Sequence, residues 1–245
     1  RDMTFEPNDQ RPACVIVGAG GHGRVVLDIL LSGRQYRPVG FLDSNPAMHG
    51  RRMDGLPILG DLAALSDLRN QGVSRAIVAI GDNGVRRGFA QRVEDAEMEL
   101  INAVHPSANL AHNVSLGRNV VVAAGALVCA HCQIGDSAIL NTGCIVDHES
   151  MIGTAAHICP GAKLAGRVTV ESGAFVGIGA TVLQGLRIGY ESVVGGGAVV
   201  IQDVEPLTTV VGVPARLLHL APDYEAFAQM LTPPSLRQPL VAAST

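Results

Sequence analysis

The segment from Val146 to Ser150 combines an imidazole, His148, with two flanking carboxylates, Asp147 and Glu149. A carboxylate beside a histidine raises the basicity of the imidazole and fixes its tautomer, which is what a general base near neutral pH requires. His148 is therefore the first candidate for proton transfer, with Glu149 as its supporting acid. The alternative is that His148 is a solvated turn residue without a chemical role.

A second pattern that suits chemistry is GAGGHG at residues 18–23, between the apolar run 13–17 and helically spaced apolar residues from Val25 to Leu30. Free amides of Gly20, Gly21 and His22 at a helix start favour phosphate oxygens. Asp43 lies 20 residues beyond the last glycine, so the dinucleotide fingerprint GxGxxG is formally met. We expect a single nucleotide-like ligand, since about ninety residues hold only half of a dinucleotide fold. An NAD-binding oxidoreductase or regulatory module, and a glycine turn needed only for packing, are the alternatives.

The elements that position the residues around His148 are visible in the hydrophobic pattern. A branched aliphatic residue occupies every sixth position from residue 104 to residue 200, which fits neither the period of an α-helix nor that of a single strand. This stride is typical of hexapeptide repeats that stack as a left-handed parallel β-helix, three repeats to a coil. The positions are Val104, Leu110, Leu116, Val122, Val128, Ile134, Leu140, Val146, Ile152, Ile158, Leu164, Val170, Val176, Val182, Ile188, Val194 and Val200.

A coil of about 18 residues predicts which side chains are vertical neighbours. Gly166 then stacks on His148, and we expect its amide to be open to solvent and able to donate to a developing oxyanion. His131 stacks on Glu149 and is expected to orient it. His157 is expected to reach the same edge as His148.

Two further features of the repeats lead to predictions. The fourth residue after each aliphatic position is mostly small, as a tight inward corner requires. The turns are rich in glycine, from which we expect positive φ. These glycines are Gly117, Gly135, Gly153, Gly177 and Gly189.

The residues before the repeats predict a small βαβ-type parallel sheet. Strands are expected at 13–17, 39–42 and 76–80, and a helix with Val85, Phe89 and Val93 on its inner face follows the third strand. The chain then divides into a flexible segment 1–12, an α/β domain 13–102 of half-Rossmann type, the β-helix 103–205, and a cap and tail 206–245.

Composition excludes several classes of partner. The net charge is −4, and the chain has neither a run of basic residues nor an apolar stretch long enough to span a membrane. We therefore expect no nucleic-acid partner and no membrane insertion, and a cytoplasmic location follows because no signal-peptide pattern is seen. Cys129, His131 and Cys132 lack a second ligand pair at zinc-ribbon spacing, so we expect free thiols and no metal.

A set of motifs in this order resembles the bacterial sugar O- and N-acyltransferases of the sialic acid O-acetyltransferase type, over residues 13 to about 218. The motifs are VIVGAGGHGRVVLDIL, FLD, VAIGDN, HPSA, LNTGCIVDHES, GAKLAGRVTV, FVGIGATVL, GGGAVV and VGVPAR. The resemblance is nearest to the N-acetyltransferases that act on nucleotide-linked 4-amino-6-deoxy sugars. It implies acetyl-CoA as cosubstrate, a UDP- or GDP-linked amino sugar as acceptor and a homotrimer, in a bacterium.

The resemblance also implies roles for individual residues. His148 falls on the family's general base, Glu149 on its supporting acid and Gly166 on the amide that holds the thioester carbonyl. Positions that contact coenzyme A fall on His157, Gly166, Ile178, Arg187 and Gly196. Positions of the nucleotide-sugar site fall on Gly20, Gly21, His22, Asp43, Ser44 and Gly81. An O-acetyltransferase acting on sialic acid or another sugar remains the alternative within this chemistry.

Overall fold

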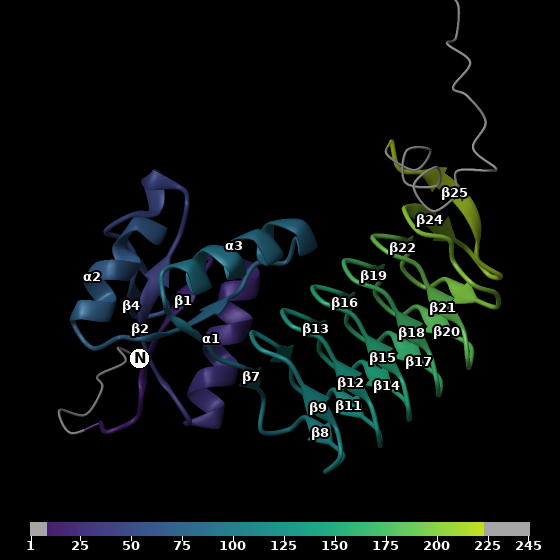
Figure 1. Cartoon of the computed structure of the whole chain (residues 1–245), viewed down its shortest axis with the longest axis horizontal. Helices are drawn as coiled ribbons and strands as arrows, with labels where there is room; N and C mark the ends of the chain where they lie inside the picture. Colours follow the sequence, from purple (N-terminus) through teal and green to yellow (C-terminus); the bar gives the residue numbers. More distant parts are fainter. Residues whose placement is uncertain (1–8, 223–245) are drawn as a thin grey trace, which may run out of the picture.

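The computed structural model describes residues 9–222, and the expectations for residues 1–8 and 223–245 lie outside this range. A small α/β domain stands at one end of a three-sided parallel β-helix, whose other end carries the last two strands (Figure 1). The predicted fold class, a parallel-sheet domain followed by a left-handed β-helix, is confirmed.

The amino-terminal domain is built on a four-stranded parallel sheet of order β2-β1-β5-β6. Its strands are β1 (Ala13–Val17), β2 (Arg37–Leu42), β5 (Arg75–Val78) and β6 (Glu99–Leu100). Its helices are α1 (Gly21–Gly33), α2 (Leu65–Asn70) and α3 (Asn83–Asp95), with 3-10 turns η1 (Pro46–Met48) and η2 (Leu62–Ala64) and a small hairpin of β3 (Arg52–Met53) and β4 (Leu56–Pro57). The three predicted strands are present.

The inner face of α3 differs from the prediction. Val93 is buried, but Val85 is exposed and Phe89 is only half-buried, whereas the side chain that is completely buried is Arg86. The apolar stripe of this helix therefore has another use than filling the core.

The β-helix consists of two-residue strands that pair with the strand 18 residues away, as Val121 pairs with Ile139. One face contains β7 (Ala103–Val104), β10 (Val121–Val122), β13 (Ile139–Leu140), β16 (His157–Ile158), β19 (Phe175–Val176) and β22 (Val193–Val194), followed by β24 (Thr208–Val211) and β25 (Arg216–Leu220). The second contains β8 (Asn109–Leu110), β11 (Leu127–Val128), β14 (Ile145–Val146), β17 (Lys163–Leu164), β20 (Thr181–Val182) and β23 (Val199–Val200). The third contains β9 (Ser115–Leu116), β12 (Gln133–Ile134), β15 (Met151–Ile152), β18 (Thr169–Val170) and β21 (Arg187–Ile188).

The interior of the β-helix confirms the predicted pattern. The branched aliphatic residues form one core, only partly buried at the first coil, and small residues such as Ala126, Cys132 and Cys144 fill its corners without solvent exposure. All five cysteines are free, and burial raises the pKa of the Cys144 thiol to about 12. Cys144 is thus an inert core residue.

The prediction that the turn glycines supply positive φ is wrong. Positive φ occurs two residues later in each repeat, often at a non-glycine residue such as Asn119 or Glu149. Gly135 is needed for a different reason, because a Cβ there would lie 2.7 Å from the backbone nitrogen of Thr154 in the next coil. Gly117, Gly153, Gly177 and Gly189 are constrained in the same way.

The two domains are joined along one corner of the β-helix, which we call the docking column: residues 119, 137, 155, 173 and 191. Each residue of the column contacts the segment from β5 to α3. The Asn119 side chain accepts from the Val78 N–H, the Arg86 guanidinium donates to the carbonyls of Ser137 and Ala155, Asn83 donates to the carbonyl of Gly173, and Arg87 pairs with Glu191. The amino-terminal domain is therefore fixed to five successive coils.

None of the helices among residues 9–222 combines the length and apolar character needed to cross a bilayer.

Candidate functional site

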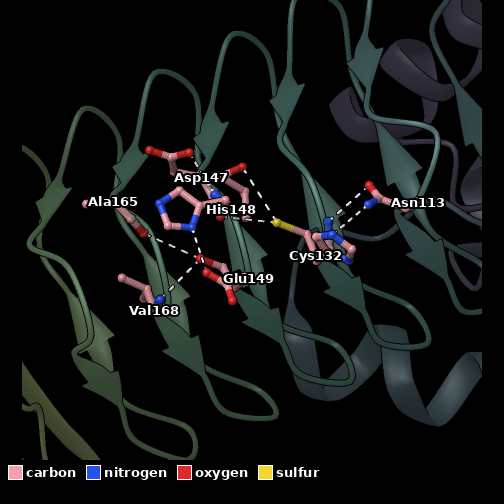
Figure 2. A network of polar contacts seen from close by, with 10 residues as sticks. Asn113, Cys132, Asp147, His148, Glu149, Ala165 and Val168 are labelled. Carbon is pink, nitrogen blue, oxygen red and sulfur yellow. Dashed lines mark hydrogen bonds and ion pairs between the residues drawn. The ribbon is translucent and has the colours of Figure 1, made fainter.

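His148 lies at the corner between β14 and β15, on the outside of the prism. Its ring is about half exposed, and its Nδ1 lies 3.0 Å from Oε2 of Glu149 (Figure 2). A hydrogen bond from Nδ1 to a carboxylate leaves the lone pair on Nε2, which is the arrangement of a general base. Asp147 does not contact the ring; its Oδ1 accepts from the His148 backbone N–H at 2.7 Å, which lowers the pKa of the Asp147 carboxyl.

Gly166 is the vertical neighbour of His148, as the repeat length predicts. A Cβ at position 166 would lie 2.4 Å from Nε2 of His148, so the imidazole occupies the space that the glycine leaves. Within residues 9–222 the Gly166 N–H has no hydrogen-bond acceptor. We expected this amide to be open to solvent, which is wrong for this conformation, because the residue is buried against the His148 ring.

His131 does not orient Glu149. Its Nε2 lies 3.0 Å from Nδ2 of Asn113 in the preceding coil, and the His131 N–H also bonds to that asparagine (Figure 2). Glu149 has a φ of 58°, so the turn itself points its side chain back to His148.

His157 is not on the edge that carries His148. It lies in β16, on the face that packs against the amino-terminal domain, with its ring 6.4 Å from that of His22 and 5.2 Å from that of Phe175. Its Nε2 contacts Nδ2 of Asn141 at 3.1 Å. Burial lowers the pKa of His157 to about 4, and the charge of Arg86 contributes in the same direction. Within one chain, His148 and His157 therefore belong to different sides of the prism.

The other residues expected to contact coenzyme A also occupy separate places. Ile178 and Gly196 stack on each other at the corner between the face of β16 and the face of β17, and both are exposed. Arg187 lies in β21, where its guanidinium is close to Glu171 and Glu205. A channel that includes all of these positions cannot be formed by one chain.

A cavity of about 740 Å³ lies at the carboxyl ends of β1, β2 and β5. All residues expected at the nucleotide-sugar site line this cavity, and they are Gly20, Gly21, His22, Asp43, Ser44 and Gly81. The prediction from the sequence thus brings together one continuous pocket in the amino-terminal domain.

The glycines of the turn have two different roles. A Cβ at Gly18 would lie 2.7 Å from the Ala79 carbonyl, and one at Gly23 would lie 2.2 Å from the Gly18 carbonyl, so these two are required for packing. At Gly20 and Gly21 a Cβ would meet nothing within 4 Å. The packing alternative therefore explains the outer glycines but not the two that face the cavity.

The start of α1 is also open toward the cavity. No side chain caps this helix and no acidic residue lies in its first turn, whereas α3 begins with the Asp82 side chain bonded to the Val85 N–H. Unpaired amides at a helix start attract anions. The Asp43 carboxylate accepts from the N–H groups of Ala19 and Asn45, so it shapes the loop beside this helix start.

One wall of the cavity has no counterpart in the sequence motifs. It is formed by Asp61, Leu62 and Ala63 and, from α3, by Val85, Phe89 and Arg92. Arg92 stacks on the Phe89 ring at 5.2 Å and is the cation that lines the cavity in the described structure. The misassigned apolar stripe of α3 was the available signal for this wall.

The described residues contain no group of three or more His, Cys, Asp or Glu side chains arranged to hold a metal ion.

Comparisons with known proteins agree with both domains. Residues 14–93 match the family model described as the PglD N-terminal domain. A segment of 110 residues is 33% identical to UDP-N-acetylbacillosamine N-acetyltransferase of Bacillus subtilis (strain 168), covering 44% of this chain and 50% of that relative's length. The match thus spans about half of the curated relative.

Solved structures match over most of the chain. A variant of perosamine N-acetyltransferase from Caulobacter crescentus, in complex with CoA and GDP-perosamine, is 41% identical with a TM-score of 0.82, covering 84% of this chain and 97% of that one. The acetyltransferase domain of PglB from Neisseria gonorrhoeae, in complex with acetyl coenzyme A, is 31% identical with a TM-score of 0.80, covering 85% and 100%. This chain belongs to the hexapeptide-repeat family of nucleotide-amino-sugar N-acetyltransferases.

Proposed function

We propose that this protein transfers the acetyl group of acetyl-CoA to the amine of a nucleotide-linked 4-amino-4,6-dideoxy sugar, with His148 as the general base. The observation that carries the proposal is the stack of the His148 ring on Gly166, with Nδ1 bonded to Glu149 and Nε2 directed at the glycine. It places a proton acceptor beside an unpaired backbone N–H. The nucleotide is UDP or GDP, since relatives with either substrate class are similar to this chain.

The reaction proceeds by direct transfer. Nε2 of His148 takes a proton from the acceptor amine as its nitrogen attacks the thioester carbonyl, and the oxyanion that forms accepts the Gly166 N–H once the imidazole has turned toward the substrate. The tetrahedral intermediate then breaks its C–S bond, and the CoA thiolate takes the proton from the imidazolium. The products are the N-acetylated sugar nucleotide and free CoA, and neither a covalent enzyme intermediate nor a metal is required.

The nucleotide part of the acceptor binds in the cavity of the amino-terminal domain. Its phosphates lie over the amides of Gly20, Gly21 and His22 at the uncapped start of α1. Asp43, Ser44 and Gly81 complete this side of the cavity. Coenzyme A contacts His157, Gly166, Ile178, Arg187 and Gly196.

This assignment requires more than one chain, because His148 and the His22–His157 region lie on different sides of the prism. We infer a homotrimer in which His148 of one chain faces the nucleotide cavity of its neighbour. Sedimentation is expected to give three chains per particle. A stable monomer that is fully active would refute this arrangement.

The proposed function is tested by release of free thiol from acetyl-CoA with a panel of UDP- and GDP-linked 4-amino sugars. We expect turnover with an amino sugar of one nucleotide class, and a loss of kcat of about two to four orders of magnitude in His148→Ala. Transfer to free sialic acid without UDP or GDP binding would instead support the O-acetyltransferase alternative. Saturable NAD binding without acetyl-CoA binding would refute acyl transfer.

A mixing experiment tests the shared site. His148→Ala lacks the base, and Gly21→Val fills the cavity without disturbing its surroundings, because position 21 is open. If the site is formed by two chains, coexpression of the two inactive variants restores part of the activity. If each chain contains a whole site, the mixture stays inactive.

A further inference from the structure

Arg86 is a charged residue that the proposed mechanism leaves without a role. It is completely buried, and it donates to the Ser137 carbonyl through Nε, to the Ile80 and Gly81 carbonyls through Nη1, and to the Ala155 carbonyl and the Asn83 side chain through Nη2. Among the described residues no carboxylate forms an ion pair with it. A buried cation without a counter-ion is costly, so it is retained where its hydrogen bonds serve a purpose.

The partners of Arg86 belong to three parts of the molecule. Ile80 and Gly81 form the turn after β5, and both line the nucleotide cavity. Ser137 and Ala155 belong to two successive coils in the docking column. One planar guanidinium therefore holds the wall of the nucleotide cavity against the β-helix, a geometry that the fixed fork of arginine permits and a lysine ammonium does not.

Two histidines meet beside this turn, His22 from the cavity and His157 from β16. Their rings are 6.4 Å apart, and Nε2 of His22 and Nδ1 of His157 are buried without a hydrogen-bond partner in residues 9–222. Unpartnered buried nitrogens of this kind are ready to bind polar groups of a ligand that enters the cavity.

We propose that Arg86 is a positioning residue that fixes the Ile80–Gly81 turn on the β-helix and so sets the spacing of His22 and His157 across the domain boundary. The proposal rests on the proposed function, because it assigns the two histidines to the acceptor end of the nucleotide-sugar site. Arg86 itself does not touch the ligand. It acts through the turn and through the two imidazoles.

The charge of Arg86 supports this role. Burial is the main cause that lowers the pKa of both His22 and His157 to about 4, and Arg86 is the charged side chain that lowers both further. His157 is additionally influenced by His22, and its pKa is raised slightly by the Gly81 backbone; Asp82 acts on Arg86 in the opposite direction to burial. Both imidazoles are thus neutral at neutral pH and do not repel an amine that must lose its proton.

The experiment compares Arg86→Met, which removes the charge and the fork, with Arg86→Lys, which keeps the charge alone. Arg87→Met is the matched control, because Arg87 follows on the same helix and also joins the docking column, through Glu191, without contacting the cavity turn. Histidine titration by NMR without substrate and thiol-release kinetics are measured on the full chain. The wild-type kinetics test the proposed function, and the histidine titration tests the positioning role separately.

We expect Arg86→Met to raise the pKa of His22 and His157 and to move the acid limb of kcat/KM to higher pH. Its KM for the nucleotide sugar should rise by about tenfold to a hundredfold, with a smaller change in KM for acetyl-CoA. Arg86→Lys should keep the low histidine pKa values but share the raised KM, and Arg87→Met should match the wild type in both.

Wild-type KM and acid limb in folded Arg86→Met would overturn the proposal. If that variant does not fold, wild-type KM in Arg86→Lys would overturn it in the same way. Failure of both variants to fold, with Arg87→Met folded, would also overturn it by assigning Arg86 a purely structural role.

Discussion

Replacing Gly166 by alanine moves the proposed general base without removing it. The new Cβ would lie 2.4 Å from Nε2 and 2.6 Å from Cε1 of His148, whereas ordinary contact begins near 3.4 Å. The ring must therefore retreat by about 1 Å. The backbone does not resist the change, because Ala130, Thr142 and Ile178 occupy the same turn position in other repeats.

The expected effect is on the rate and not on the fold. A displacement of about 1 Å in a catalytic group lowers kcat roughly a hundredfold. The His148 side chain is 49% exposed, so it can move into solvent without disturbing the core. The melting temperature of Gly166→Ala should stay within a few degrees of wild type.

Thiol-release kinetics of Gly166→Ala, His148→Ala and the double variant form the test. If the alanine acts through the imidazole, the double variant is no slower than His148→Ala, since coupled changes are not additive. Gly88→Ala serves as the control, because position 88 is open and far from the site, and it should keep wild-type kcat. A kcat of Gly166→Ala within about twofold of wild type, or an equal loss in the His148→Ala background, would refute the reasoning.

Three further predictions concern the cavity, the glycine turn and pH. Gly21→Val should leave the melting temperature unchanged and weaken UDP or GDP binding at least about tenfold in a calorimetric titration, because its side chain enters open cavity space; unaltered affinity would place the phosphates elsewhere. Gly23→Ala should lower the unfolding free energy by about 1–3 kcal/mol in urea, since its Cβ would lie 2.2 Å from the Gly18 carbonyl; a neutral effect would contradict the close packing. The folded pKa of His157 is about 4, below the unfolded value of 6.5, so the unfolded chain binds the extra proton; the stability contributed by neutral His157 is present above pH 6.5 and is lost as the pH falls to about 4. Urea unfolding across this range should show a smaller acid loss for His157→Asn, and an identical pH dependence in both proteins would count against the burial of a neutral imidazole.

The sequence predicted those features that depend on local spacing. The stride of six placed Gly166 on His148 because strand pairing at 18 residues repeats without interruption between β7 and β23. The glycine turn and Asp43 predicted one side of the nucleotide cavity because they follow strands whose carboxyl ends meet at one sheet edge. Both inferences need only the regular geometry of their elements.

The features that the sequence did not reveal depend on contacts between distant segments. Burial of Arg86 requires carbonyls 51 and 69 residues away, and nothing around position 86 indicates them. The separation of His148 from His157 follows from which face each repeat occupies, and the nine residues between them cross a corner. Positive φ at Glu149 is imposed by the coil below, against the usual preference of that residue.

The docking column restricts how this β-helix can change in length. An added coil between Asn119 and Glu191 would shift all later partners of α3 by about 4.8 Å and separate at least one side of the interface. Duplication of whole coils is compatible with the present domain arrangement only beyond Glu191, where the neighbouring elements are β24 and β25. The distance from the nucleotide cavity to the first coils is thereby constant, and growth of the prism can extend only its far end.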